Sequence, residues 1–166
     1  SLFLCATGAA KHTRITDFRD PRLKDFRRAL LEVCTGLSQA IVRDAEGASR
    51  FVTLHVTGAA SMQAARKIGR TIASATLFKV SMAETLPPWG RMIMAVGKSG
   101  ERADRDRLAI DVGGLPVARE GAVIDGYDAD GVAAHLKGAE IELSIDIGIG
   151  RGKATVWTCD RSKGYG

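Results

Sequence analysis

The sequence predicts an α+β fold in which a mostly antiparallel sheet and packed helices form a roll-like domain from about residue 49 onward. Three patterns support this prediction. Apolar residues recur at helical spacing between residues 23 and 41, apolar and polar residues alternate at strand spacing in 51–57, and the same alternation returns in 141–147. The patterns follow the order helix, strand, helix, strands, helix and hairpin, which is typical of α+β domains.

Composition limits the class of protein. With 166 residues, 45% hydrophobic and 26% charged, the chain can form one soluble domain, or one domain and part of another. Its 24 basic and 19 acidic residues are mixed along the sequence, which indicates a solvated surface rather than a nucleic-acid interface. The three cysteines are widely spaced and match neither a disulfide framework nor a zinc motif. We therefore expect a cytoplasmic protein without a metal site or membrane contact.

The first part of the chain reads as one strand and one long helix. Residues 1–8 suit a short buried strand, and because it begins without a preceding turn we expect it to belong to a larger domain. Asp20 is a suitable N-cap, with Pro21 at the first helical position. Gly36 weakens the helix by about 1 kcal/mol relative to alanine, so packing must stabilise it. The apolar stripe of this helix consists of Leu23, Phe26, Leu30, Val33, Leu37 and Ile41.

The middle of the chain predicts shorter elements. The strand at 51–57 is followed by Gly58 and Ser61, which introduce a second helix. We interpret the short apolar run at 77–82 as another strand. Residues 87–91 form a rigid turn that leads into an apolar segment at 92–96. The inward residues of the second helix are Met62, Ala65, Ile68 and Ile72.

The last third of the chain predicts a hairpin, a helix and two strands. Residues 108–112 and 115–118 flank two glycines that permit the positive φ of a tight hairpin turn. Residues 128–137 form a short helix that Gly138 ends. The strands at 141–147 and 154–159 are joined by a Gly-rich segment that superficially resembles a phosphate loop. Because it lacks the Walker spacing and precedes a strand, we interpret it as a hairpin turn.

The turn between the long helix and the strand at 51–57 is the strongest candidate site. It carries two carboxylates, Asp44 and Glu46, beside Gly47. A helix-to-strand turn holds polar groups at the edge of a core, where ligand-binding residues often lie. The same composition also suits an ordinary solvated turn. The residues alone leave both interpretations open.

Several sequence blocks occur together along the whole chain. They are Ala6-Thr7-Gly8-Ala9, Asp20-Pro21-Arg22-Leu23-Lys24, Arg43-Asp44-Ala45-Glu46-Gly47-Ala48, Val56-Thr57-Gly58-Ala59, Ile72-Ala73-Ser74 with Leu77 and Lys79, Trp89-Gly90-Arg91, Ala95-Val96-Gly97, Gly150-Arg151-Gly152 and Ala154-Thr155-Val156-Trp157-Thr158-Cys159-Asp160. In order and spacing they resemble the C-terminal part of the beta chain of the bifunctional ornithine acetyltransferase/N-acetylglutamate synthase (glutamate N-acetyltransferase) family.

This resemblance implies an acyltransferase of arginine biosynthesis. Such a protein cuts itself into an alpha and a beta chain and works in the cytoplasm as a heterotetramer of two alpha-beta pairs. A threonine at the start of the beta chain, upstream of this sequence, attacks the acetyl group of N-acetylornithine and passes it to glutamate; its own amino group can serve as general base. The resemblance implies no metal and no organic cofactor, with acetyl-CoA as an additional acetyl donor in bifunctional members.

The resemblance also implies domains and site residues. Residues 1–48 would be a fragment of the catalytic domain, an α/β/β/α sandwich of the N-terminal-nucleophile type, and 49–166 the C-terminal α+β domain. No catalytic residue falls in this chain. Glu46 corresponds to a carboxylate that holds the amino-acid part of the substrate, and a carboxylate suits the cationic amine of ornithine. Asp44 would brace the turn, while Lys79, Trp89 and Arg91 would support the site without contacting the substrate.

Departures from the family pattern leave other interpretations open. The chain has Lys-Val-Ser at 79–81 where the family has Lys-Thr-Ala, a second proline at Pro88 where it has asparagine, and Ala45 in place of a glycine. It therefore also fits a catalytically dead or truncated homologue that acts only as a folded assembly module. A third interpretation, a basic nucleic-acid-binding domain, rests on the pI of 9.4 alone.

Overall fold

A computed structural model describes Cys5, residues 7–9 and residues 11–160. The chain divides into two compact units, Ser1–Ser38 and Gln39–Gly166, each of which is considered by itself. The predicted domain boundary after residue 48 stays a prediction. Most of the strand predicted for residues 1–8 lies outside the described residues, and Cys5, Thr7 and Gly8 are exposed and belong to no strand.

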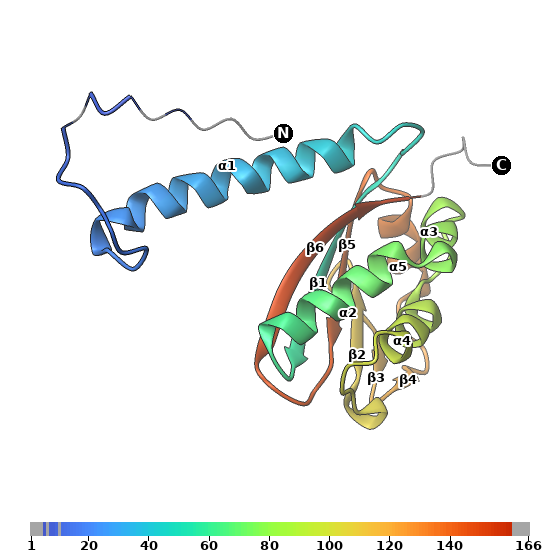
Figure 1. Cartoon of the computed structure of the whole chain (residues 1–166). Coiled ribbons are helices and arrows are strands. Elements are labelled where there is room, and N and C mark those ends of the chain that lie inside the picture. Colours follow the sequence, from blue (N-terminus) through green and yellow to red (C-terminus); the bar gives the residue numbers. More distant parts are fainter. Residues whose placement is uncertain (1–4, 6, 10, 161–166) are drawn as a thin grey trace. The chain divides into compact units, whose positions relative to one another are not determined.

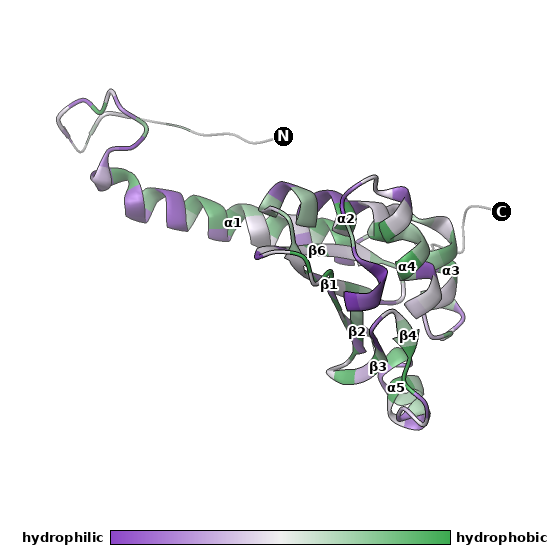
Figure 2. Ribbon diagram, turned by 90° about the horizontal axis from the view of Figure 1, so that it is seen from below, coloured by the Kyte–Doolittle hydropathy of each residue, from purple (hydrophilic) through white to green (hydrophobic). Residues whose placement is uncertain are grey.

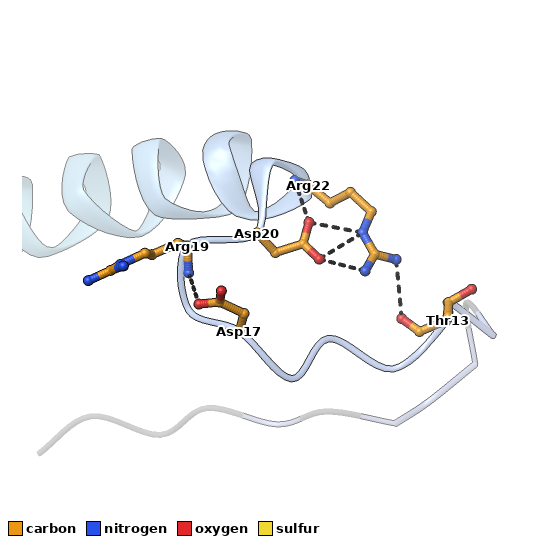
Figure 3. Close-up of polar contacts among 5 residues, drawn as sticks. All are labelled: Thr13, Asp17, Arg19, Asp20 and Arg22. Atoms are coloured by element: carbon orange, nitrogen blue, oxygen red, sulfur yellow. Dashed lines mark hydrogen bonds and ion pairs between the residues drawn. The ribbon is translucent and has the colours of Figure 1, made fainter.

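The long helix begins where the sequence indicates. A short 3₁₀ helix, η1 (Pro21–Leu23), leads into α1 (Lys24–Arg43). One carboxylate oxygen of Asp20 accepts a hydrogen bond from the backbone N–H of Arg22 at 2.9 Å, and the other pairs with the Arg22 guanidinium at 2.6 Å (Figure 3). These contacts lower the pKa of Asp20 to about 2, since they stabilise the charged carboxylate. The predicted N-cap is confirmed.

Hydrophobic and hydrophilic residues recur in turn along α1 at helical spacing, as the predicted apolar stripe requires (Figure 2). This is the pattern of an amphipathic helix. No residue of α1 is buried within the part of the chain that the structure describes, and Ile41 exposes 74% of its surface. The prediction that packing stabilises this helix stays a prediction.

One six-stranded sheet forms the centre of the second unit, in the order β4-β3-β2-β5-β1-β6 (Figure 1). The pairing of β1 with β5 is parallel, and the other four pairings are antiparallel, which confirms the predicted mostly antiparallel sheet. The strands are β1 (Phe51–Ala59), β2 (Ala109–Val112), β3 (Leu115–Arg119), β4 (Ala122–Val123), β5 (Glu140–Asp146) and β6 (Gly152–Cys159).

Helices cover one face of this sheet and enclose a single core (Figure 1). The hydroxyl of Ser61 caps the first of them by accepting from the N–H of Ala64 at 3.1 Å. The core includes Leu54 of β1, Ile145 of β5 and Ile68 of α2, all fully or almost fully buried. The helices are α2 (Met62–Ser74), α3 (Thr76–Ala83), α4 (Trp89–Lys98) and α5 (Ala129–Leu136), with a 3₁₀ turn η2 at Arg105–Arg107.

Two predictions for the middle of the chain are wrong. Residues 77–82 lie in α3 and not in a strand, because Phe78 and Met82 are one helical turn apart and both face the core. The rigid turn predicted for 87–91 ends earlier, since α4 already begins at Trp89. The apolar segment that follows is helical, with Met92 and Val96 buried at the same spacing.

The two predicted hairpins have different outcomes. β2 and β3 pair through Gly113 and Gly114, whose φ angles are 58° and 78°, so this hairpin is confirmed. β5 and β6 are not neighbours, because β1 lies between them. The Gly-rich segment instead crosses the end of β1, where the N–H of Gly150 donates to the carbonyl of Gly58 at 2.8 Å. A side chain at position 150 would meet the backbone oxygen of Ala59 at 2.4 Å.

Candidate functional site

The candidate site is the turn that joins α1 to β1. Asp44 and Glu46 are both exposed on it, and Gly47 adopts the positive φ of 71° that favours glycine. Two backbone hydrogen bonds hold the turn: the N–H of Asp44 donates to Ala40 at 2.9 Å, and the N–H of Ala48 donates to Ala45 at 3.0 Å. The Glu46 carboxylate therefore projects from an ordered turn into solvent.

An ion pair fixes the end of α1, immediately before this turn. The guanidinium of Arg43 binds both carboxylate oxygens of Glu140, the first residue of β5, with Nη2 at 3.1 Å from Oε2. The same guanidinium carbon lies 3.7 Å from the centre of the Phe51 ring on β1. Pairing raises the pKa of Arg43 and lowers the pKa of Glu140, since each charge stabilises the other.

A buried carboxylate fixes the other end of the turn. Asp160, directly after β6, is 3% exposed. It accepts hydrogen bonds from the Ser49 N–H at 2.8 Å, the Ser49 hydroxyl at 2.6 Å and the Arg50 N–H at 3.1 Å. The Arg50 side chain continues this network, because its guanidinium donates to the carbonyl of Met82 and to the hydroxyl of Thr85 at the end of α3.

This arrangement presents the exposed carboxylates of Asp44 and Glu46 between two fixed ends. Charge-assisted hydrogen bonds from an ammonium to a carboxylate are about twice as strong as neutral ones. A turn that is already ordered loses little conformational entropy when a ligand binds. Chemically, Glu46 is thus suited to bind a cationic amine, and its own position is set by Arg43 at one end and Asp160 at the other.

The other predicted site residues lie on the helical layer. Lys79 is half-buried on α3, and Trp89 starts α4 with its ring packed against the core. Arg91 lines a cavity of about 360 Å³ at the beginning of α3. Arg50, which belongs to the network at the turn, contacts the other end of α3. Because α3 has eight residues, its two ends are about 12 Å apart. Within the described part of the chain, no hydrogen bond or ion pair joins Lys79, Trp89 or Arg91 to Glu46. Their supporting roles, like the bracing role of Asp44, stay predictions.

Two further features of the described residues bear on the type of site. Among them, no group of three or more histidine, cysteine or acidic side chains is arranged to hold a metal ion. No helix in the same residues has the length and apolar character required to cross a bilayer.

Sequence reasoning did not assign roles to the residues that fix the turn. Asp160 stands at the end of a strand, 111 positions from Ser49, and Glu140 stands 97 positions from Arg43. The sequence does show that Asp160 is an acidic residue directly after a predicted strand. Its partners, however, can be identified only once the pairing of β1 with β6 is known.

A crystal structure of the arginine biosynthesis bifunctional protein ArgJ from Bacillus halodurans matches 96% of this chain and 75% of its own, with a TM-score of 0.87 and 30% sequence identity. The chain therefore has the α+β fold of that protein.

The model of the ArgJ family matches residues 1–166, and the chain belongs to this family. It is 46% identical to the arginine biosynthesis bifunctional protein ArgJ of Gluconobacter oxydans, over 99% of this chain and 39% of the relative. It is 48% identical to the protein of the same name from Brucella suis, over 99% of this chain and 41% of the relative. The chain thus spans about two fifths of the length of these relatives.

Proposed function

We propose that the protein containing this chain transfers an acetyl group from N-acetylornithine to glutamate in arginine biosynthesis. The observation that supports this most strongly is the ArgJ family match over residues 1–166, together with relatives that are named arginine biosynthesis bifunctional proteins. Because the chain spans about two fifths of those relatives, the proposal applies to the complete protein and not to this chain alone.

The proposed reaction has two halves. A threonine hydroxyl, upstream of this chain and exposed by self-cleavage, attacks the carbonyl carbon of the acetyl group; an ester forms, and the amine of ornithine leaves with a proton. The amine of glutamate then attacks the ester carbonyl, the amide of N-acetylglutamate forms, and the threonine oxygen recovers its proton. Donors around the carbonyl oxygen stabilise each tetrahedral intermediate.

Glu46 contributes binding and not bond making in this scheme. Its carboxylate would hold the free side-chain amine of N-acetylornithine and thereby orient the acetyl group. Support comes from its exposure and from the fixed ends of its turn, at Arg43 and Asp160. Orientation of this kind converts binding energy into rate, since a misplaced carbonyl lies outside the range of the nucleophile.

The remaining elements of the proposal follow from the same resemblance. The alpha chain of the same precursor and a second alpha-beta pair would complete the assembly, in the cytoplasm. No metal or organic cofactor takes part, and acetyl-CoA would serve as a second acetyl donor if the protein is bifunctional.

The test uses the protein expressed from its complete coding sequence. Glu46→Gln keeps the shape of the side chain and removes its charge, so we expect the KM for N-acetylornithine to rise about tenfold to a hundredfold. The control is Glu84→Gln, which removes an exposed carboxylate beyond α3 and should leave the KM unchanged. Equal kinetics for the two variants would contradict the role of Glu46.

The alternative, an inactive homologue that serves as an assembly module, is decided by the same preparation. The Lys-Val-Ser segment at 79–81 departs from the family pattern and motivates it. Self-cleavage followed by acetyl transfer supports the enzyme. A folded protein that neither cleaves itself nor transfers acetyl groups supports the alternative.

A further inference from the structure

A second site candidate lies between helices α2, α3 and α4, on the helical layer. The cavity of about 360 Å³ that contains Arg91 falls within the range of about 300–1,000 Å³ that is usual for small-molecule sites. Its walls combine two cations with apolar side chains. The residues that matter here are Thr76, Leu77, Phe78, Arg91, Met94 and Lys98, which we term the cationic cavity.

The cationic cavity adjoins the exposed face of α2. The two share Thr71 and Ser74 as lining residues, so they are contiguous. The face of α2 adds three more cations, Arg66, Lys67 and Arg70. Five basic side chains thus border the depression formed by the cationic cavity and the adjoining face of α2, and three of them fall within residues 66–70.

Most of these cations have no acidic partner. Lys67 pairs with Glu101 at 2.9 Å, whereas Arg66, Arg70, Arg91 and Lys98 form no ion pair with any residue that the structure describes. Grouped like charges repel one another in the free protein, and a bound anion relieves this repulsion. Four unpaired cations match a ligand with several negative charges better than they match a single carboxylate.

The hydroxyl groups of the cationic cavity and of the adjoining face of α2 are compatible with such a ligand. Thr71 and Ser74 donate their protons to backbone carbonyls, at 2.9 Å and 2.8 Å, which directs those protons away from the depression. Thr76 makes no side-chain hydrogen bond within the described part of the chain and can donate to an anion. The first turn of α3 also lacks a side-chain cap, so its N–H groups add donors to the same wall.

The apolar wall implies an organic part in the ligand. Leu77 and Met94 are 48% and 47% exposed and flank the cationic cavity, while Phe78 is fully buried behind them. An inorganic anion would leave the two exposed side chains in water. A ligand with a ring or another apolar group would cover them and gain about 25 cal/mol for each Å² of apolar surface that is buried.

We propose that the cationic cavity and the adjoining surface of α2 bind a phosphorylated organic anion. Its phosphate groups lie between Arg91, Lys98 and the cations of α2, and its apolar group covers Leu77 and Met94. This site is separate from Glu46, which offers a negative charge at a turn and binds a ligand of opposite sign.

Isothermal titration calorimetry on the protein from its complete coding sequence tests the proposal, with ADP, pyrophosphate and adenosine as probes. ADP should bind most tightly, because it alone supplies both charges and a ring. Pyrophosphate should bind less tightly, and adenosine least. Affinity for ADP and for pyrophosphate should fall as salt rises to about 0.15 M, since exposed charges are screened.

Two variants separate the halves of the site. Lys98→Gln should weaken both ADP and pyrophosphate about tenfold or more, the usual effect of losing one charged hydrogen bond. Met94→Gln should weaken ADP and leave pyrophosphate unchanged. The matched control, Lys153→Gln, removes an exposed lysine on β6 outside the depression and should change neither affinity. Lys98→Gln should also leave acetyl transfer unchanged, so failure here is distinguishable from failure of the proposed function.

Three results would overturn the proposal. The first is the absence of binding by ADP and pyrophosphate in a protein whose fold is confirmed by circular dichroism. The second is an equal loss of affinity in Lys98→Gln and Lys153→Gln, which would indicate a general effect of net charge. The third is a single-stranded oligonucleotide that binds more tightly than ADP and is weakened by the same variants, which would make the depression a nucleic-acid surface.

Discussion

Removal of the buried carboxylate of Asp160 should destabilise the protein through the turn that carries Glu46. In Asp160→Ala the N–H groups of Ser49 and Arg50 and the hydroxyl of Ser49 lose their acceptor. Ser49 is exposed, so its hydroxyl can turn to water. Two backbone N–H groups remain without a partner, and at about 1–3 kcal/mol for each we expect a loss of about 2–6 kcal/mol in unfolding free energy.

The isosteric variant Asp160→Asn gives a graded result. Its amide oxygen can still accept from both backbone N–H groups, and the Ser49 hydroxyl can accept from the new amide nitrogen. Only the charge assistance is lost, which corresponds to about 1 kcal/mol. The order of stability should therefore be wild type, Asn variant, Ala variant.

Urea unfolding followed by tryptophan fluorescence measures this order, because Trp157 lies on β6 close to Asp160 in the sequence. Asp125→Ala is the matched control, since Asp125 is exposed in a turn and makes no side-chain hydrogen bond among the described contacts. Hydrogen exchange of the Arg50 amide should accelerate in Asp160→Ala. An Ala variant as stable as the Asp125→Ala control would refute the argument.

Two further predictions concern conformation and pH. Hydrogen bonds from Arg22 lower the pKa of Asp20 from 3.8 to about 2. The charged carboxylate therefore stabilises the start of the helix at pH values above 3.8, and this contribution disappears as the pH falls toward 2. An NMR titration should show the Asp20 pKa rising in Arg22→Gln; an unchanged value would contradict the assignment. Gly58→Ala should lower stability by more than about 2 kcal/mol, since φ is +65° and the new Cβ would lie 1.9 Å from Asp146 Oδ1. Gly97→Ala, a helical position with open space, should be neutral or stabilising by thermal unfolding, and similar losses in both variants would contradict this account.

Local sequence patterns predicted the elements whose structure depends on neighbours along the chain. Asp20 followed by proline located the start of a helix, and two adjacent glycines located the turn of the β2–β3 hairpin. The segment at 77–82 could not be assigned in this way, because a short apolar run suits a strand and a buried helix equally. Packing of Phe78 and Met82 against the core decided the outcome.

Local patterns could not predict the order of the strands either. β5 and β6 are separated by a short Gly-rich segment, which by itself is typical of a hairpin. The insertion of β1 between them depends on pairing with residues 89 and 98 positions earlier, Thr57 with Asp146 on one side and Val56 with Ala154 on the other. The spacing of residues along the chain does not identify contacts between residues so far apart.

The candidate site also combines a feature that depends on neighbouring residues with contacts between residues far apart in the sequence. Glu46 could be selected from the sequence because the turn around it is local, but the groups that fix the turn, Asp160 and Glu140, come from strands far along the chain. This difference provides a way to interpret variants. Glu46 is exposed, so its substitution should affect ligand binding without changing stability, whereas loss of Asp160 should change both. A loss of substrate affinity in Glu46→Gln at unchanged unfolding free energy would therefore assign Glu46 a direct contact with the substrate and not a part in holding the turn.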